Sequence, residues 1–207
     1  MSIRRADKRR SKNRRTTVAL AAAASCLLLL TAIYLWLLGG TTPTPAPSIG
    51  GPFTLTRGDG QQVTDRDFRG RYLLIYFGYT TCPDVCPTTL NTIANAIGLL
   101  GARAERLQPL FVTVDPAHDT PAVMQDYVRA FSPHIIGLTG TPAQIHAVEQ
   151  EYRISSIVHD TGPGPSNYTV DHTAVLFLIA PDGRYLAPNA VTETPAELAK
   201  SLSRYIG

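Results

Sequence analysis

Two cysteines four residues apart carry the strongest chemical signal in this sequence. Cys82 and Cys86 stand in the segment GYTTCPDVCP, between a continuous apolar run and a helical pattern. Residues four apart share one face of a helix, so both sulfurs can point the same way. The amino terminus of a helix also lowers the pKa of a thiol and favours the thiolate. Such a pair can close a disulfide, or it can bind a soft metal such as Cu(I).

A purely structural disulfide is the simplest alternative for this pair, and an oxidising compartment would permit it. A bond between Cys82 and Cys86 would close only a very short loop. It would therefore constrain the unfolded chain less than a long-range disulfide. The position of the pair, at a predicted turn from strand to helix, favours chemistry over stabilisation.

A metal site needs a further donor besides two thiolates, and the sequence offers five histidines. His172 is one candidate, at the predicted start of a strand and just after a Gly/Pro-rich loop. Asp171 beside it could orient the ring or hold local charge, as carboxylates behind metal ligands do. His118 lies in a polar turn and is expected to be solvated. Ordinary surface or core positions are expected for His134, His146 and His159.

Three motifs, in order, resemble those of the Sco (SenC) copper chaperones. The first runs over Phe77–Pro87 and contains both cysteines. The second runs over Val112–Pro121, and the third is Val170–Thr173 followed by Pro181–Gly183. The resemblance extends from about Pro52 to Gly207.

The resemblance implies a thioredoxin-like fold with an insertion, and Cu(I) or Cu(II) held by Cys82, Cys86 and His172. Asp84 and Asp171 are expected to support these ligands from behind. The family also implies a role in maturing the binuclear CuA centre of cytochrome c oxidase subunit II. Another periplasmic copper chaperone or a thiol reductase would be a further partner. One departure is visible, because His118 stands where the family commonly carries arginine. The electrostatic role of that position is therefore in doubt, and His118 becomes a hypothetical weak extra donor.

Other functions use the same residues. A thiol–disulfide oxidoreductase would use Cys82 and Cys86 to reduce oxidised cysteines on a copper-site partner. Its spacing would be C-x3-C, however, whereas thioredoxin-type enzymes use C-x2-C. In addition, His172 stands where the resemblance would place the proline that faces the cysteines in thioredoxins. A copper or redox sensor is a third reading, and the sequence does not separate it from a chaperone. Tyr79 and Tyr168 could flank a docking face, although core packing is the preferred interpretation.

Strands alternating with helices must position these residues, and they predict an α/β fold with a central mixed sheet covered by helices. A Gly/Pro-rich loop is expected over Asp160–Asn167, and copper binding is expected to order the segment Asp160–Tyr168. The expected strands are Phe53–Thr56, Gln61–Val63, Tyr72–Phe77, Leu107–Val114, Ile135–Leu138, Ala174–Ile179 and Arg184–Leu186. The expected helices are Pro87–Leu100, Pro121–Phe131, Pro142–Tyr152 and one capped by Thr194.

The amino-terminal part predicts a single membrane anchor. Eight of the 19 basic residues lie in a tail over residues 1–15, and an apolar segment follows over 16–38. About 20 apolar residues span a bilayer, and the basic side stays in the cytoplasm. A Pro/Gly/Thr-rich linker over 39–51 would then tether the domain of residues 52–207. A cleaved signal peptide is less favoured, because the apolar run is too long. A lipoprotein at Cys26 is also less favoured, because mostly apolar residues follow it.

Charge and composition limit the partners. Beyond residue 15 the chain carries 11 basic and 15 acidic residues, so no basic surface for nucleic acid is expected. Few lysines with many alanines and arginines are typical of GC-rich bacteria. The expected location is therefore a bacterial inner membrane, with the domain in the periplasm.

Overall fold

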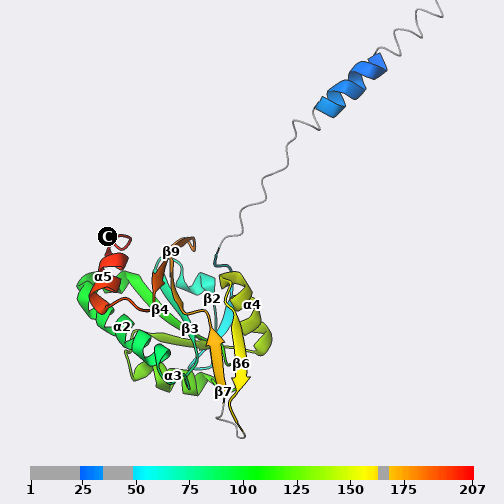
Figure 1. Cartoon of the computed structure of the whole chain (residues 1–207). Coiled ribbons are helices and arrows are strands. Elements are labelled where there is room, and N and C mark those ends of the chain that lie inside the picture. The colour runs from blue at the N-terminus through cyan, green and yellow to red at the C-terminus, as the bar shows by residue number, and fades with distance from the viewer. Residues whose placement is uncertain (1–23, 35–48, 163–167) are drawn as a thin grey trace, which may run out of the picture. The chain divides into compact units, whose positions relative to one another are not determined.

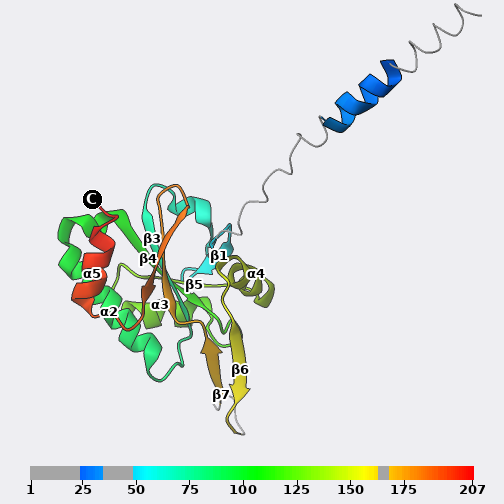
Figure 2. The ribbon, with the colours of Figure 1, turned by 45° about the horizontal axis from the view of Figure 1, so that its top comes forward.

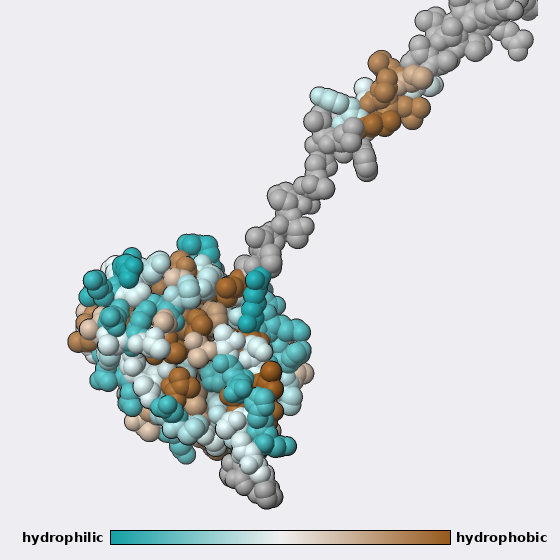
Figure 3. Space-filling model, in the orientation of Figure 1, coloured by the Kyte–Doolittle hydropathy of each residue, from teal (hydrophilic) through white to brown (hydrophobic). Residues whose placement is uncertain are grey.

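The computed structural model describes residues 24–34, 49–162 and 168–207, in two compact units, Met1–Ala46 and Pro47–Gly207. In the first unit, residues 24–34 form a helix whose leucines are exposed. Figure 3 shows the hydrophobic colour of this segment. Within the described ranges, no helix has both the length and the apolar character to cross a bilayer. The predicted anchor over 16–38 extends beyond the described residues at both ends, and the tail over 1–15 lies outside them.

A seven-stranded mixed sheet forms the centre of the second unit (Figure 1). Its strand order is β2-β1-β5-β4-β3-β8-β9. The sheet contains both parallel and antiparallel pairs, as predicted. The strands are β1 (Thr54–Arg57), β2 (Gln62–Thr64), β3 (Tyr72–Gly78), β4 (Leu107–Thr113), β5 (Ile136–Thr139), β8 (Val175–Ile179) and β9 (Tyr185–Ala190).

The central strands β3 and β4 are apolar along nearly their whole length because both of their faces are covered. They pair in parallel, with Tyr76 opposite Phe111, while β8 pairs antiparallel with the other edge of β3. The parallel β3 and β4 end at the same edge of the sheet. The first motif therefore emerges from β3 beside the second motif, which emerges from β4.

Helices cover both faces of the sheet. The helix α2 (Val85–Leu100) packs against α5 (Pro195–Ser203), and in both views α4 (Pro142–Tyr152) lies across the sheet from them (Figures 1 and 2). The helix α3 (Pro121–Arg129) packs against β5. The buried residues Cys86, Leu90 and Ile93 recur at helical spacing along α2, which buries the second cysteine with the core face. This helix begins two residues earlier than predicted, and α3 ends two residues earlier.

A separate antiparallel hairpin extends beyond the central sheet (Figure 2) and consists of β6 (Ser156–Asp160) and β7 (Tyr168–His172). No strand was predicted over 156–160, because most of its side chains are exposed and show no buried alternation. The predicted loop begins only after Asp160, and residues 163–167 lie outside the described ranges. The prediction for His172 was also wrong, since it ends β7 rather than beginning the next strand. Thr173 and Ala174 separate the two strands.

The cap at the start of the carboxyl-terminal helix α5 is expected to contribute to the stability of the protein. Thr194 accepts a hydrogen bond from the Glu197 amide at 3.3 Å, and Glu197 accepts one from the Thr194 amide at 2.8 Å. We expect Thr194→Ala to lower the free energy of unfolding by about 1 kcal/mol in a urea titration. Thr88→Ala on the exposed side of α2 is the control, with an expected change within about 0.5 kcal/mol. Equal losses in both variants would contradict the capping role.

Candidate metal centre

The two cysteines meet although only one of them lies in the helix. Cys82 occupies the turn before α2, and Cys86 lies in the first turn of the helix. The backbone N–H of Cys86 donates to Sγ of Cys82 at 3.4 Å. Both cysteines are free and buried, and Cys86 is completely covered. The turn therefore brings the sulfurs together, rather than a shared helix face as the spacing predicted.

The environment divides the two sulfurs into one thiolate and one thiol. The pKa of Cys82 is lowered to about 5, chiefly by the hydrogen bond from the Cys86 side chain, while burial opposes the shift. The backbone N–H groups of Asp84 and Cys86 lower it further. The pKa of Cys86 is raised by the same hydrogen bond to Cys82 and by burial. At neutral pH the pair is therefore a Cys82 thiolate that accepts a hydrogen bond from a Cys86 thiol.

His172 faces the buried sulfur through its Nε2 atom. This nitrogen lies 3.7 Å from Sγ of Cys86, while Nδ1 lies 3.2 Å from the carbonyl oxygen of Thr173. A carbonyl can only accept, so Nδ1 carries the proton and Nε2 keeps its lone pair towards the sulfur. Within the described residues, no three His, Cys, Asp or Glu side chains already form a complete metal cage. Small movements of the side chains would therefore be needed before they could hold a metal ion together.

The sulfur of Cys86 is enclosed by β3. The hydroxyl of Tyr76 donates to it at 3.6 Å. A Cβ atom added to Gly78 would lie 2.8 Å from the same sulfur and 2.7 Å from the ring of Phe111. Glycine at position 78 thus lets the strand approach Cys86 closely, which explains why the apolar run ends in a glycine directly before the cysteine turn.

The second motif holds this turn in place through a buried carboxylate. Asp119 is completely covered and accepts hydrogen bonds from the hydroxyls of Thr80 and Thr113, each at 2.5 Å. The backbone N–H of Thr80 donates to it at 3.2 Å. Burial raises the pKa of the Asp119 carboxyl, and these donors oppose that shift. The carboxylate therefore links the end of β3 to the end of β4.

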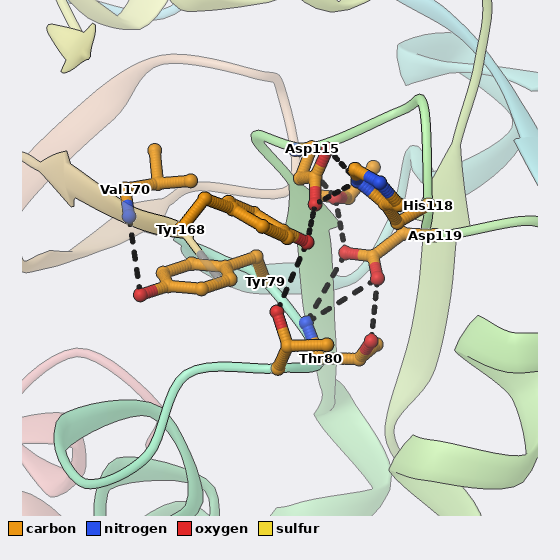
Figure 4. A network of polar contacts seen from close by, with 9 residues as sticks. Tyr79, Thr80, Asp115, His118, Asp119, Tyr168 and Val170 are labelled. Atoms are coloured by element: carbon orange, nitrogen blue, oxygen red, sulfur yellow. Dashed lines mark hydrogen bonds and ion pairs between the residues drawn. The ribbon is translucent and has the colours of Figure 1, made fainter. Parts of the chain in front are cut away.

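The third motif is fastened to the second by a clasp of three side chains, Asp115, His118 and Tyr168 (Figure 4). The hydroxyl of Tyr168 donates to the Asp115 carboxylate, and Nδ1 of His118 lies 2.9 Å from the same carboxylate. The imidazole of His118 stacks on the Tyr168 ring at 4.7 Å. The prediction that His118 is solvated is therefore wrong in part. Its side chain is 46% exposed, but it also contacts Asp115 and Tyr168.

Tyr79 connects the cysteine turn to the strand that carries His172. Its hydroxyl accepts a hydrogen bond from the Val170 amide at 3.2 Å (Figure 4), and its ring meets that of His172 edge-on at 6.1 Å. Only 3% of Tyr79 is exposed, and Tyr168 is half-buried. The preferred interpretation of these two tyrosines as packing residues is confirmed, since both pack against the hydrophobic core.

The positions of Asp171 and Asp84, which were predicted to support the ligands, differ from that prediction. The carboxylate of Asp171 points to Nε2 of His159 at 3.0 Å, because successive side chains of a strand point to opposite faces. The carbonyl of Thr173 orients the ring of His172 instead. Asp84 caps α2 without a side-chain hydrogen bond, and its backbone N–H supports the Cys82 thiolate. A role for either carboxylate in the local charge stays a prediction.

A cavity of about 370 Å³ opens beside these groups. Its lining includes Cys82, Asp84 and Val85 from the cysteine turn, and Val170 and His172 from β7. A second molecule can thus approach Cys82 from the side where the hairpin meets the turn. The first and third motifs, far apart in the sequence, both line this cavity.

Sequence analysis did not identify several residues of this centre. The sequence analysis interpreted Tyr76 as one more apolar position of a buried strand. It interpreted Asp119 as part of a polar turn. Their partners, Cys86 and Thr80, lie in other segments of the chain, so local patterns did not indicate either contact. The only available signal was the position of Asp119 within the second motif.

Comparison with known proteins agrees with this geometry. The sequence profile of the SCO1/SenC family matches residues 41–207. This chain belongs to the SCO1/SenC family. It is 39% identical over 166 residues to the human protein SCO1 homolog, mitochondrial, covering 77% of this chain and 54% of that protein. The chain thus spans about half the length of that curated relative.

Two solved structures of the family share the fold. The structure of Bradyrhizobium japonicum ScoI with copper bound is 45% identical, with a TM-score of 0.71. The match covers 76% of this chain and 99% of that one. The structure of yeast Sco1 with copper bound is 34% identical, with a TM-score of 0.70, and the match covers 77% and 89% of the two chains. The predicted thioredoxin-like mixed sheet with flanking helices is thereby confirmed.

The acidity of Cys82 is directly measurable. We expect the ultraviolet absorbance of the metal-free, reduced Cys26→Ser protein to show one thiolate that is lost as the pH falls through about 5. A depressed pKa means that the thiolate persists above that value. Cys82→Ser in the same background should remove the transition. A midpoint near 9, the ordinary value for a cysteine, would contradict the hydrogen-bonded pair.

The clasp makes a second prediction, about the stability of the hairpin. Tyr168→Phe removes the hydroxyl that bonds Asp115 and lies 3.1 Å from the Thr81 hydroxyl. We expect amide hydrogen exchange in β7 to accelerate about tenfold, since a net hydrogen bond contributes about 1 kcal/mol or more. Tyr205→Phe, after the end of α5, is the control. Equal exchange in β7 of the wild type and of Tyr168→Phe would show that the clasp does not hold the hairpin.

Proposed function

We propose that this chain is a copper chaperone that binds one copper ion through Cys82, Cys86 and His172. The observation that carries the proposal is the meeting of a thiolate, a second cysteine and an imidazole lone pair beside an open cavity. Thiolate ligands select Cu(I), and an imidazole suits both copper valences. The copper-bound structures of two relatives support the same cargo.

The residues suit a cargo that must be released again. Cys82 already carries the charge needed for the first bond, and it lines the cavity from which a partner would approach. Cys86 lies deeper and must give up its proton before it can ligate, whereas His172 lines the same cavity as Cys82. Because the third ligand sits on a hairpin, its withdrawal would open the site. Transfer can then proceed by stepwise exchange with thiolates of the partner.

We infer that the recipient is the CuA centre of cytochrome c oxidase subunit II, which the resemblance of the three motifs implies. Another periplasmic copper chaperone or a thiol reductase would act before this step. The proposed organisation is the one predicted from the sequence: an anchor over 16–38, a linker over 39–51 and a copper-binding domain over 52–207. The anchor would hold the domain on the periplasmic face of a bacterial inner membrane.

A thiol–disulfide oxidoreductase is the second candidate. The depressed pKa of Cys82, next to a free Cys86, favours it, because a thiolate is the attacking species in disulfide exchange. His172 argues for the metal instead, since its lone pair faces the sulfur. The two activities can also coexist, because donor and acceptor cysteines must both be reduced for copper transfer.

A Cu(I) titration of the reduced full chain against a competing chelator tests the proposal. We expect tight one-to-one binding in the wild type and its loss in Cys82→Ala and Cys86→Ala. His172→Ala should weaken binding by roughly 10–100-fold or more, since even residues behind metal ligands cost that much. The matched control is His159→Ala on the same hairpin, which should bind nearly as the wild type does.

Three other outcomes are informative. Full retention of copper without either cysteine would rule out the proposed site. Weak binding in every protein, together with a readily reduced Cys82–Cys86 disulfide, would favour the oxidoreductase. A reduced copper stoichiometry in His118→Ala would support the extra donor suggested by the sequence, whereas an unchanged titration would exclude it.

A further inference from the structure

A tyrosine hydroxyl is buried directly behind the inner cysteine. Tyr76 lies in the middle of β3 and is completely covered. Its hydroxyl donates to Sγ of Cys86 at 3.6 Å, and its ring meets the imidazole of His172 edge-on at 6.4 Å. One side chain thus touches two of the three proposed copper ligands from the protein interior.

The packing of the core does not by itself require this hydroxyl. Tyr76, Phe111 and Tyr127 form a row of rings with centroids 5.7 Å apart. Phenylalanine already fills the central position of this row. At its other end, the hydroxyl of Tyr127 is buried and finds no hydrogen-bond partner among the described residues. The hydroxyls of the two terminal tyrosines therefore differ in what they meet, because only that of Tyr76 reaches a sulfur.

Two donors reach the Cys86 sulfur from inside the fold, the backbone N–H of Tyr79 and the hydroxyl of Tyr76, and only the second belongs to a side chain. The residue is 0% exposed, so water does not cover it. Gly78 and the Phe111 ring close one side, and His172 presents a lone pair rather than a proton. A buried charge without hydrogen-bond donors is costly. The Tyr76 hydroxyl supplies a donor at this position.

We propose that Tyr76 is a positioning residue that sets how strongly the Cys86 sulfur donates electrons. This deepens the proposed function and rests on it for copper. Hydrogen bonds to cysteine sulfur are known to tune the potentials of metal–thiolate centres. A donor to the sulfur stabilises the electron-rich state, so Tyr76 favours Cu(I) over Cu(II). By the same argument it favours the reduced cysteine pair over a disulfide.

The experiment compares two variants of the full chain, Tyr76→Phe and Tyr127→Phe. Each removes one buried hydroxyl from the same row of rings, but only the first removes a contact to sulfur. Urea unfolding verifies that both proteins remain folded. Affinities for Cu(I) and Cu(II) are measured by competition, and the absorbance of the Cu(II) form reports the sulfur-to-copper charge transfer.

A further experiment uses the metal-free protein in the Cys26→Ser background. It measures the equilibrium between the reduced cysteine pair and the Cys82–Cys86 disulfide in glutathione buffers. In that reaction two glutathione thiols supply the two electrons. The Cys82–Cys86 bond breaks and one glutathione disulfide forms. Of the two protons that glutathione releases, one passes to the Cys86 sulfur and the other to solvent, because Cys82 stays a thiolate. The equilibrium therefore compares the reduced and oxidised pair without copper.

For Tyr76→Phe we expect the ratio of Cu(I) to Cu(II) affinity to fall by about three- to tenfold, the range of one hydrogen bond. A tenfold fall corresponds to about 59 mV for a one-electron couple. The charge-transfer band should move to lower energy, because the sulfur electrons are less stabilised. The glutathione equilibrium should shift towards the disulfide by a similar factor. Tyr127→Phe should match the wild type in all three.

An unmoved glutathione equilibrium in Tyr76→Phe would overturn the assignment, whatever copper does. An unchanged ratio of Cu(I) to Cu(II) affinity in a Tyr76→Phe protein that binds copper would also overturn it. Shifts of the same size in Tyr127→Phe would overturn it as well. Failure of the proposed function looks different, because the wild type itself would then bind no copper. In that case the glutathione measurement alone decides the role of Tyr76.

Discussion

The geometry of the centre depends on a carboxylate that has no contact with solvent. Asp119 is surrounded by the ends of β3 and β4, and three donors from Thr80 and Thr113 satisfy it. Charge at such depth is tolerated only when hydrogen bonds replace water. The loop before Cys82 is therefore held where the donors of Thr80 reach Asp119. The position of the cysteine turn follows from this single satisfied group.

The histidine arrives by a different route, on a hairpin that extends beyond the main sheet. Hydrogen bonds fasten this hairpin to the rest of the unit: Tyr168 to Asp115, the Val170 amide to Tyr79, and Ser156 to Glu149. Most side chains of β6 are exposed, and Val170 is the one buried residue of β7. Regions held by few contacts open at low free-energy cost. The ligand set thus combines a rigid half, at the start of α2, with a half that can move.

A directional row of hydrogen bonds crosses the site. The Tyr76 hydroxyl donates to Cys86, whose thiol in turn donates to the Cys82 thiolate. Such rows polarise one another in a low-dielectric interior. One sulfur is consequently charged and close to the cavity, while the other stays protonated and deep. This asymmetry separates the groups that meet a partner from those that retain the cargo, in line with the proposed chaperone function.

The sequence alone determined those features that depend on neighbouring residues. Continuous apolar runs predicted β3 and β4, and the Thr-Pro caps predicted the starts of α3 and α5. The resemblance of the three motifs to a known family singled out Cys82, Cys86 and His172. Tertiary structure decided the β6–β7 hairpin, the end-of-strand position of His172, and the roles of Tyr76 and Asp119. Each of these rests on a contact between segments distant along the chain. Local periodicity records burial, but it does not record which polar atom lies at the other end of a hydrogen bond.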